Sequence, residues 1–282
     1  MNVHIDHFNS DNLPKPIKPV FTLRIGLAFH AKAYDPLGLV PPTRMIGNLL
    51  FRNSLQILKK EQKGKIPWDD QLPDNLMAEW LEYFEMLAQL HTINFKRSIK
   101  PVNINSNMAP ILVTFSDGNP DSYGTVAYTL WTLNDGSKVA TLMMSKAKLG
   151  PLLQKGETVR NELSGATIAS RLKEFIFEHS GIRFGDHIPF LDSQIVQAMI
   201  KKESYGFNSF AGLRVGEIQL KTDRNGWKHI PSKQNISDIL TRGAPPSMLG
   251  PGSVWQNAPS WLVQDQSTWP VTETTGEVIN NE

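Results

Sequence analysis

Apolar residues recur with two different spacings along the chain, and the change of spacing separates two regions. Between residues 44 and 91 they recur every three to four positions, which is typical of amphipathic helices. This spacing predicts one helix over Arg44–Lys60 and a second over Leu76–His91. From residue 111 onward, short runs rich in β-branched residues alternate with helical spacing, which predicts strands and helices in turn.

The second region predicts a mixed sheet covered by helices. Its first three strands should run antiparallel, because Asn134–Ser137 has the composition of a hairpin turn. The later strands alternate with helices, as in α/β layer folds. We expect strands over residues 111–115, 124–132, 138–144, 188–191 and 227–230, and helices over 162–177, 193–201, 210–220 and from 235 onward. The expected fold class is therefore α/β with a mixed sheet, preceded by a mainly helical segment.

Turn-forming residues mark the limits of three segments. Residues 1–20 are polar and proline-rich, which predicts an extended start to the chain. A second polar run, at residues 98–109, predicts a domain boundary. We therefore divide the chain into residues 1–105, 106–244 and 245–282.

The composition of the chain excludes several classes of protein. Its 282 residues are 40% hydrophobic and 20% charged, close to the average for globular domains. The absence of cysteine excludes disulfide frameworks, cysteine-ligated zinc sites and cysteine nucleophiles. No apolar run is long enough to predict a membrane span, and the first residues do not resemble a secretory signal.

Charge is unevenly distributed, although the net charge is only +2. Between residues 106 and 242 there are 16 Lys or Arg residues and 13 Asp or Glu residues. After Arg242 four acidic residues follow and no basic one. A mildly basic middle permits nucleic-acid binding without requiring it.

Four acidic residues stand where the expected elements change. Asp117 ends the first strand, Glu162 opens the first long helix, Asp192 ends the fourth strand, and Asp238 lies in the first turn of the last helix. Strand ends and helix starts at one edge of such a sheet can converge, and converging carboxylates cannot all stay ionised without cations. Carboxylate oxygens suit Mg²⁺ or Mn²⁺, and two such ions about 3.5–4 Å apart would support phosphodiester hydrolysis.

Each of these acidic residues also has a purely structural explanation. Asp117 with Gly118 suits a turn, and Glu162 suits the positive end of a helix dipole. Asp192 with Ser193 suits a helix N-cap, and the run Asn235–Asp238 resembles a capping box. The residues alone leave both interpretations open.

Several motifs resemble those of one family when they are taken in order. The chain contains AYDPLGLV at 33–40, TFSD at 114–117, SKAKLGPL at 145–152 and HIPSKQNISDILTRG at 229–243, with WDD at 68–70, RNEL at 160–163, FLDS at 190–193, and then Trp255, Trp261 and Trp269. Over about residues 21–271 the chain resembles the C-terminal part of the polymerase of BEL/Pao long-terminal-repeat retrotransposons.

This resemblance implies a ribonuclease H-like domain that follows a reverse transcriptase. The family's Asp-Glu-Asp-Asp set corresponds to Asp117, Glu162, Asp192 and Asp238. The implied activity is cleavage of the RNA strand of RNA–DNA hybrids with two Mg²⁺ or Mn²⁺ ions. The implied partners are the hybrid and the rest of the polyprotein, with no membrane. The implied location is the cytoplasmic virus-like particle of the element, or the nucleus.

The resemblance also assigns roles to the flanking segments. Residues 1–105 would be a thumb- or connection-like remnant of the reverse transcriptase, and residues 245–282 would lead towards an integrase. The polymerase motif Tyr-x-Asp-Asp, the retropepsin motifs Asp-Thr-Gly and Asp-Ser-Gly, and cysteines for an integrase zinc site are all absent. We therefore expect neither polymerase nor peptidase activity from this chain.

The chain departs from its relatives at two places. Gly118 and Asn119 follow the first aspartate, where many relatives carry a small residue and serine. The loop at residues 231–234 is too short for the mobile histidine of cellular ribonucleases H. We therefore expect His229 to be a packed or edge histidine and not a catalytic one.

Basic and aromatic residues supply candidates for substrate contact. An RNA–DNA hybrid is recognised through its shape, its phosphates and its 2′-hydroxyls. The candidate nucleic-acid-binding residues are Lys146, Lys148, Arg160, Arg214 and Arg242, and the alternative for each is a solvated surface charge. The three tail tryptophans could stack on bases. We expect them instead to cover the edge of the sheet or to dock the linker to the integrase, because burial is the commoner role of aromatic residues.

Two further interpretations stay open. The chain could be a catalytically silent ribonuclease H-like module from a truncated or host-adopted element, which binds nucleic acid or protein. The complete acidic set argues against this, and the missing polymerase site argues for it. The chain could also be a fragment of a larger reading frame. Metal-dependent turnover separates the enzyme from the silent module.

Overall fold

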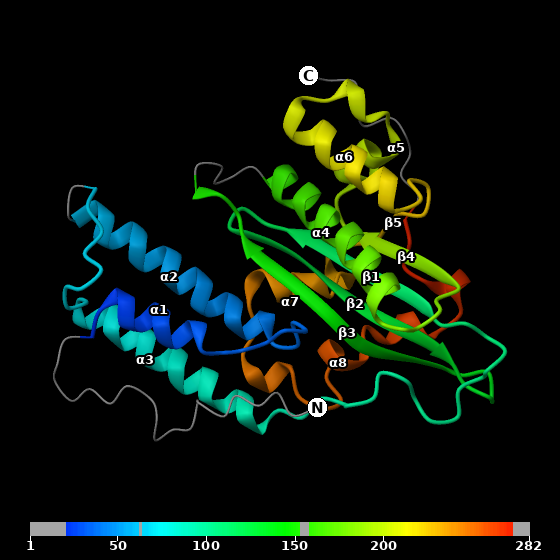
Figure 1. Cartoon of the computed structure of the whole chain (residues 1–282), viewed down its shortest axis with the longest axis horizontal. Coiled ribbons are helices and arrows are strands. Elements are labelled where there is room, and N and C mark those ends of the chain that lie inside the picture. The colour runs from blue at the N-terminus through cyan, green and yellow to red at the C-terminus, as the bar shows by residue number, and fades with distance from the viewer. Residues whose placement is uncertain (1–20, 62–63, 153–157, 273–282) are drawn as a thin grey trace.

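A five-stranded mixed sheet forms the centre of the molecule (Figure 1). The computed structural model of the chain describes residues 21–61, 64–152 and 158–272. The strands are β1 (Ile111–Gly118), β2 (Ser122–Thr132), β3 (Lys138–Leu149), β4 (Asp186–Leu191) and β5 (Lys228–His229), in the spatial order β3-β2-β1-β4-β5. Strands β1 to β3 pair antiparallel, whereas β4 runs parallel to both β1 and β5.

Helices lie before the sheet in sequence, between its later strands and after its last strand. Those before it are α1 (Leu23–Ala31), α2 (Pro41–Glu61) and α3 (Asp74–Ala88). Those after β3 are α4 (Thr158–His179), α5 (Gln194–Lys201), α6 (Ser209–Lys221), α7 (Ser237–Arg242) and α8 (Val254–Asn257). None of the helices in the described ranges is both long and apolar enough to cross a membrane.

The predicted α/β fold with a mixed sheet is confirmed, and β1 to α7 follow the predicted order. The prediction that Glu162 opens its helix is wrong, because α4 already begins at Thr158 and Glu162 lies in its second turn. Residues 158–161 carry little apolar spacing, so the pattern did not reveal this first turn. Helix α1 was not predicted; Thr22 caps it by accepting a hydrogen bond from the backbone nitrogen of Ile25 at 3.3 Å.

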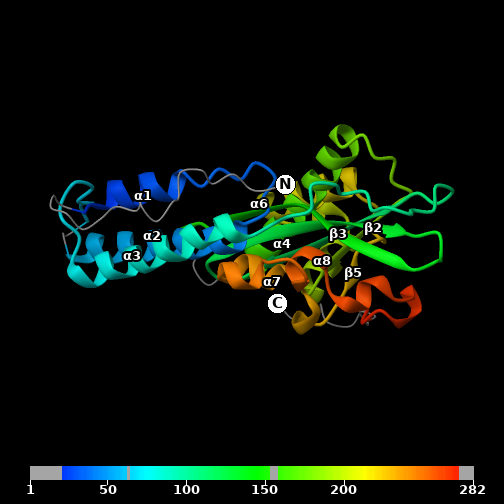
Figure 2. The same ribbon diagram turned by 90° about the horizontal axis from the view of Figure 1, so that it is seen from below.

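The two faces of the sheet are covered by different elements (Figure 2). On one face, Leu112 of β1 packs with Leu172 and Ile176 of α4. On the other face, a larger cluster joins Phe115 of β1 to residues of α7, α8 and the C-terminal tail. Neighbouring residues of β1 therefore point into different cores, as the two-residue repeat of a strand requires.

Helices α1 to α3 lie beside the β3 edge of the sheet (Figure 1). The loop before α2 fastens them there: the backbone nitrogen of Ser145 donates to Leu37 O at 3.1 Å, and Ser145 Oγ donates to Gly38 O at 2.6 Å. Gly38 has φ +67°, and a side chain on it would lie 1.9 Å from the Ser145 carbonyl oxygen. The contact therefore requires glycine.

One buried cluster includes residues from all three segments defined above. It contains Trp80 of α3, Phe115 of β1 and Trp255 of α8, each at most 1% exposed. The N-terminal helices and the C-terminal tail therefore share a core with the sheet.

Candidate metal and nucleic-acid site

Asp117 and Asp192 lie at the same level of two neighbouring parallel strands. Strands β1 and β4 pair with Phe115 opposite Phe190, and each aspartate follows its phenylalanine by two residues. Adjacent strands are about 4.8 Å apart, so the sheet brings the two backbones close together. Asp117 is only 7% exposed.

Helices α4 and α7 approach the same end of the sheet. Helix α4 crosses so close to the end of β1 that a side chain on Gly118 would lie 2.2 Å from the backbone nitrogen of Glu162. Helix α7 carries Asp238 in its first turn and Thr241 in the next. The hydroxyl of Thr241 donates a hydrogen bond to Asp117 Oδ2, which fixes α7 against the end of β1.

The four carboxylates are close enough for their charges to act on one another. Burial raises the pKa of Asp117 to about 6; the hydrogen bond from Thr241 opposes this shift, while the charges of Asp192 and Asp238 add to it. Burial also raises the pKa of Glu162, and the charges of Asp192 and Asp117 contribute to that shift. The fold thus concentrates negative charge at this end of the sheet.

Two further side chains donate hydrogen bonds to this cluster. Ser193 Oγ donates to Glu162 Oε2 at 2.5 Å, and Arg242 Nε donates to Asp238 Oδ1 at 2.5 Å. Within the described parts of the chain, the Asp192 carboxylate accepts no hydrogen bond and forms no ion pair. The sequence analysis did not single out Ser193 or Thr241 as supporting residues, although each follows a predicted acidic residue closely.

The chemistry of this donor set fits a hard divalent cation, because it consists of carboxylate oxygens only. As the side chains stand, however, no three His, Asp or Glu residues in the described ranges are arranged to hold one metal ion. One oxygen of Asp238 pairs with Arg242. The types of donor therefore fit a hard divalent cation.

Capping explains two of the acidic residues less well than the sequence suggested. Ser193, and not Asp192, caps α5, because its Oγ accepts from the backbone nitrogen of Val196 at 3.3 Å. At α7 the N-cap residue is Ile236, with no side-chain cap bond. The capping box considered for residues 235–238 is therefore not formed.

His229 is a packed histidine, as predicted. It is 7% exposed, its Nε2 donates to the backbone oxygen of Asp192 at 3.1 Å, and its Nδ1 accepts from the hydroxyl of Thr272. Both ring nitrogens are therefore engaged by groups within the fold. Through Asp192 O, the histidine also supports the backbone that carries one of the four acidic residues.

Arg160 and Arg214 meet at one aromatic ring. Their guanidinium carbons lie 4.0 and 3.5 Å from the centroid of Phe210. The pKa of Arg214 is lowered, first by burial, and the positive charges of Arg171 and Arg160 also lower it. Arg171 thus belongs to the same basic cluster, although the sequence analysis did not select it.

The remaining basic candidates lie elsewhere around the site. Lys146 and Lys148 are exposed on β3, which extends five residues beyond its predicted end at Met144. Arg242 lies beside the carboxylates, where it pairs with Asp238.

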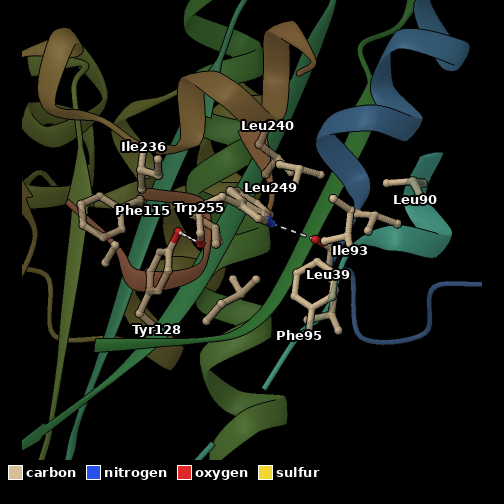
Figure 3. Close-up of a cluster of buried hydrophobic side chains, with 14 of the residues drawn as sticks. Leu39, Leu90, Ile93, Phe95, Phe115, Tyr128, Ile236, Leu240, Leu249 and Trp255 are labelled. Carbon is tan, nitrogen blue, oxygen red and sulfur yellow. Dashed lines mark hydrogen bonds between the residues drawn. The ribbon is translucent and has the colours of Figure 1, made fainter. Parts of the chain in front are cut away.

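The three tail tryptophans cover a face of the sheet and not its edge, which corrects their predicted position. Trp261 and Trp269 pack against Phe190, with centroids 5.4 and 5.6 Å from its ring. Trp255 is fully buried beneath Tyr128, whose hydroxyl donates to Trp255 O at 2.8 Å (Figure 3). Trp255 and Trp269 are buried, and Trp261 is half-buried with its ring against Phe115 and Phe190, so all three contribute to the core.

The five-stranded sheet and its strand order define a ribonuclease H-like fold. A family model described as the Pao retrotransposon-like RNaseH-like domain matches residues 22–193. The chain belongs to this Pao family. The match includes Asp117, Glu162 and Asp192 and ends before Asp238.

Two solved structures resemble the chain at low sequence identity. One is a foamy viral protease-reverse transcriptase in complex with double-stranded DNA, with 11% identity, a TM-score of 0.40, and coverage of 78% of this chain and 33% of that one. The other is ribonuclease H1 from the halophilic archaeon Halobacterium salinarum NRC-1, with 14% identity, a TM-score of 0.23, and coverage of 45% and 89%. The chain thus spans about a third of the foamy viral chain. No curated protein sequence matches the chain significantly.

Proposed function

We propose that this chain acts as a retrotransposon ribonuclease H, an endonuclease that hydrolyses the RNA strand of RNA–DNA hybrids. The main support is the position of Asp117 and Asp192 at one level of β1 and β4, with the charges of Glu162 and Asp238 close by. Membership of the Pao family supports the nuclease class.

In this proposal, Asp117, Glu162 and Asp192 hold two Mg²⁺ or Mn²⁺ ions, and Asp238 completes one of the two sites. Bound ions of this kind activate a water molecule and stabilise the leaving oxygen. Nearby positive charge would also keep Asp117 ionised at neutral pH, despite a pKa raised to about 6. For Asp238 to take part, its carboxylate must leave Arg242.

Basic residues would hold the hybrid against the carboxylates. Arg160 and Arg214 present two guanidinium groups at Phe210, and Arg160 lies only two residues before Glu162. Guanidinium groups suit phosphates because they donate in a planar fork. We assign phosphate contacts to this pair, and weaker contacts to the exposed side chains Lys146, Lys148 and Arg242.

The flanking segments fit the same proposal. Residues 106–244 would form the ribonuclease H-like domain, residues 1–105 the end of a reverse transcriptase, and residues 245–282 the start of the connection to an integrase. The remaining partners would be other parts of the polyprotein.

Cleavage of a labelled hybrid tests the proposal. The RNA strand carries a 5′ label, and wild type is compared with Asp192→Asn at several Mg²⁺ and Mn²⁺ concentrations. We expect cleavage by wild type and a loss of about a hundredfold or more in Asp192→Asn, because a ligand is removed. Asp70→Asn is the matched control, since Asp70 is exposed and distant from the sheet's carboxylates. Equal cleavage by Asp192→Asn would refute the assignment.

A catalytically silent nucleic-acid-binding module is the second candidate. One observation favours it: no three acidic side chains in the described ranges are arranged as a closed metal site. This candidate predicts that folded wild type binds the hybrid and does not cleave it at any metal concentration.

A further inference from the structure

A groove of about 980 Å³ runs along β3 on the side that faces α4. Its floor is β3, one wall is the second half of α4, and the other wall is the loop and first turns of α2 over residues 35–48. None of the four acidic residues of the proposed active site lines it. Its volume lies at the upper end of the range of about 300–1,000 Å³ for small-molecule pockets.

Cationic side chains come from the floor and from both walls of this groove. Arg44, Lys146 and Lys148 come from α2 and β3, and Arg171 comes from α4. Arg171 pairs with Glu217 at 2.7 Å. Among the described residues the other three form no ion pair, so their charge is available to a ligand.

The single carboxylate in the groove lining does not cancel this charge. Asp35 uses both oxygens within its own loop, where they accept from the backbone nitrogens of Leu39 at 2.8 Å and Val40 at 2.9 Å. Asp35 therefore fixes the loop, and its single negative charge is outnumbered by the four cationic side chains of the lining.

A buried polar network fixes further donors at the α2 wall. His30 Nε2 donates to Asn48 Oδ1 at 3.0 Å, and the hydroxyl of Tyr83 donates to His30 Nδ1 at 2.8 Å. The Asn48 oxygen is thus occupied, while its amide hydrogens remain for the groove. The Nε of Arg44 is buried and has no hydrogen-bond partner among the described residues.

The rest of the lining is apolar, with one exposed aromatic platform. Met143, Met144, Leu172 and Ile176 contribute to the apolar surface. Phe175 is 47% exposed and stacks on His179 with the ring centroids 4.6 Å apart and an interplanar angle of 18°. Sites that bind single-stranded nucleic acids combine cationic side chains, which contact the phosphates, with exposed aromatic side chains, on which unpaired bases stack.

We propose that this groove binds an extended single strand of nucleic acid. Its phosphates contact Arg44, Lys146 and Lys148, and its bases pack against Phe175 and the apolar floor. A duplex keeps its base faces stacked inside, so it would leave the apolar part of the groove unused. This binding goes beyond the proposed hydrolysis and does not depend on it.

The test is the binding of fluorescein-labelled dT15 to the full chain, measured by fluorescence anisotropy in EDTA at several salt concentrations. Lys146→Gln/Lys148→Gln should weaken binding and lower the slope of log K against log salt by about 1.4, at about 0.7 per lost contact. Phe175→Ala should weaken binding about fivefold or more, because a stacked base is lost. Lys59→Gln/Lys60→Gln removes the same charge from the exposed end of α2 and should change neither value.

Three results would overturn the inference. The first is no binding of dT15 by folded wild type, and the second is equal weakening in the control double variant. The third is that both groove changes weaken a blunt RNA–DNA hybrid and leave dT15 binding unchanged, which would show a duplex site. If the protein binds dT15 through the groove but cleaves no hybrid, the proposed hydrolase activity is wrong and this inference is still supported.

Discussion

Two buried polar clusters of this protein differ in charge: one is neutral, and the other carries excess negative charge. In the helical part, His30 is 4% exposed, and burial, together with the positive charge of Arg44, lowers its pKa to about 4. It is neutral at pH 7, and Tyr83 and Asn48 satisfy both of its ring nitrogens. This cluster is complete without any ligand.

The cluster at the end of β1 is not complete in this sense. Asp117 is buried to a similar extent, but its neighbours include two further aspartates and a glutamate, and Arg242 is the only cation paired with them in the described ranges. A buried network that satisfies itself supports the fold. One that is left with excess charge indicates a ligand of the opposite charge.

The largest effect is expected from breaking the complete cluster. His30→Leu leaves the buried Tyr83 hydroxyl and the half-buried Asn48 oxygen without their partner, which should lower the free energy of unfolding by about 2–6 kcal/mol. Urea unfolding at pH 7 measures this value. His91→Leu, at an exposed histidine, is the control and should have a small effect. An unchanged free energy for His30→Leu would mean that the network does not support the fold.

A substitution in the cluster at the end of β1 is expected to raise the free energy of unfolding and not to lower it. Asp117→Asn should raise the free energy of unfolding by roughly 3 kcal/mol at pH 7 without metal, because the native pKa is about 6 and the ordinary value is 3.8. The native state binds this proton more readily, so the wild type gains stability as pH falls through about 6, and the gain is complete below about 4. The difference between variant and wild type should therefore vanish at pH 4.

The contributions of His30 and Asp117 to the pH dependence of wild-type stability should partly cancel. The lowered pKa of His30 makes the native state lose stability as pH falls from 6.5 to about 4, which opposes the contribution of Asp117. Asp117→Asn should therefore lose more stability on acidification than wild type does. Parallel curves for the two proteins would contradict the raised pKa of Asp117.

The smallest effect on stability is expected at Arg242. Its pair with Asp238 is exposed and spans one helical turn, so Arg242→Gln should change the free energy of unfolding by less than about 0.5 kcal/mol. The same change frees the Asp238 carboxylate, so it should tighten Mn²⁺ binding severalfold. Calorimetric titration measures this, and weaker binding would show that Arg242 does not compete for Asp238.

Much of the fold followed from local sequence patterns. The order from β1 to α7 was predicted correctly because β-rich runs and helical spacing alternate and turn residues separate them, as at Asn134–Ser137. Three of the four acidic residues lie where they were predicted, at the ends of two strands and in the first turn of the last helix. Glu162 was placed one turn wrongly, because the first turn of α4 lacks an apolar pattern.

Features that depend on distant segments could not be read in this way. The groove joins residues 35–48 to α4, more than a hundred positions apart, and neither segment alone carries a signal for it. The donors Ser193 and Thr241 look like ordinary helix-end residues until the fold brings them to Glu162 and Asp117. Which of the four carboxylates bind metal stays a prediction.

Calorimetric titration of the metal-free protein with Mn²⁺ is the most direct test of the excess charge at this site. We predict that wild type binds two ions at pH 7.5 and that Asp117→Asn, with the buried carboxylate neutralised, loses at least one of them. The measurement needs no turnover, so it tests metal binding separately from catalysis. Failure of folded wild type to bind Mn²⁺, or identical titrations for the two proteins, would contradict the account.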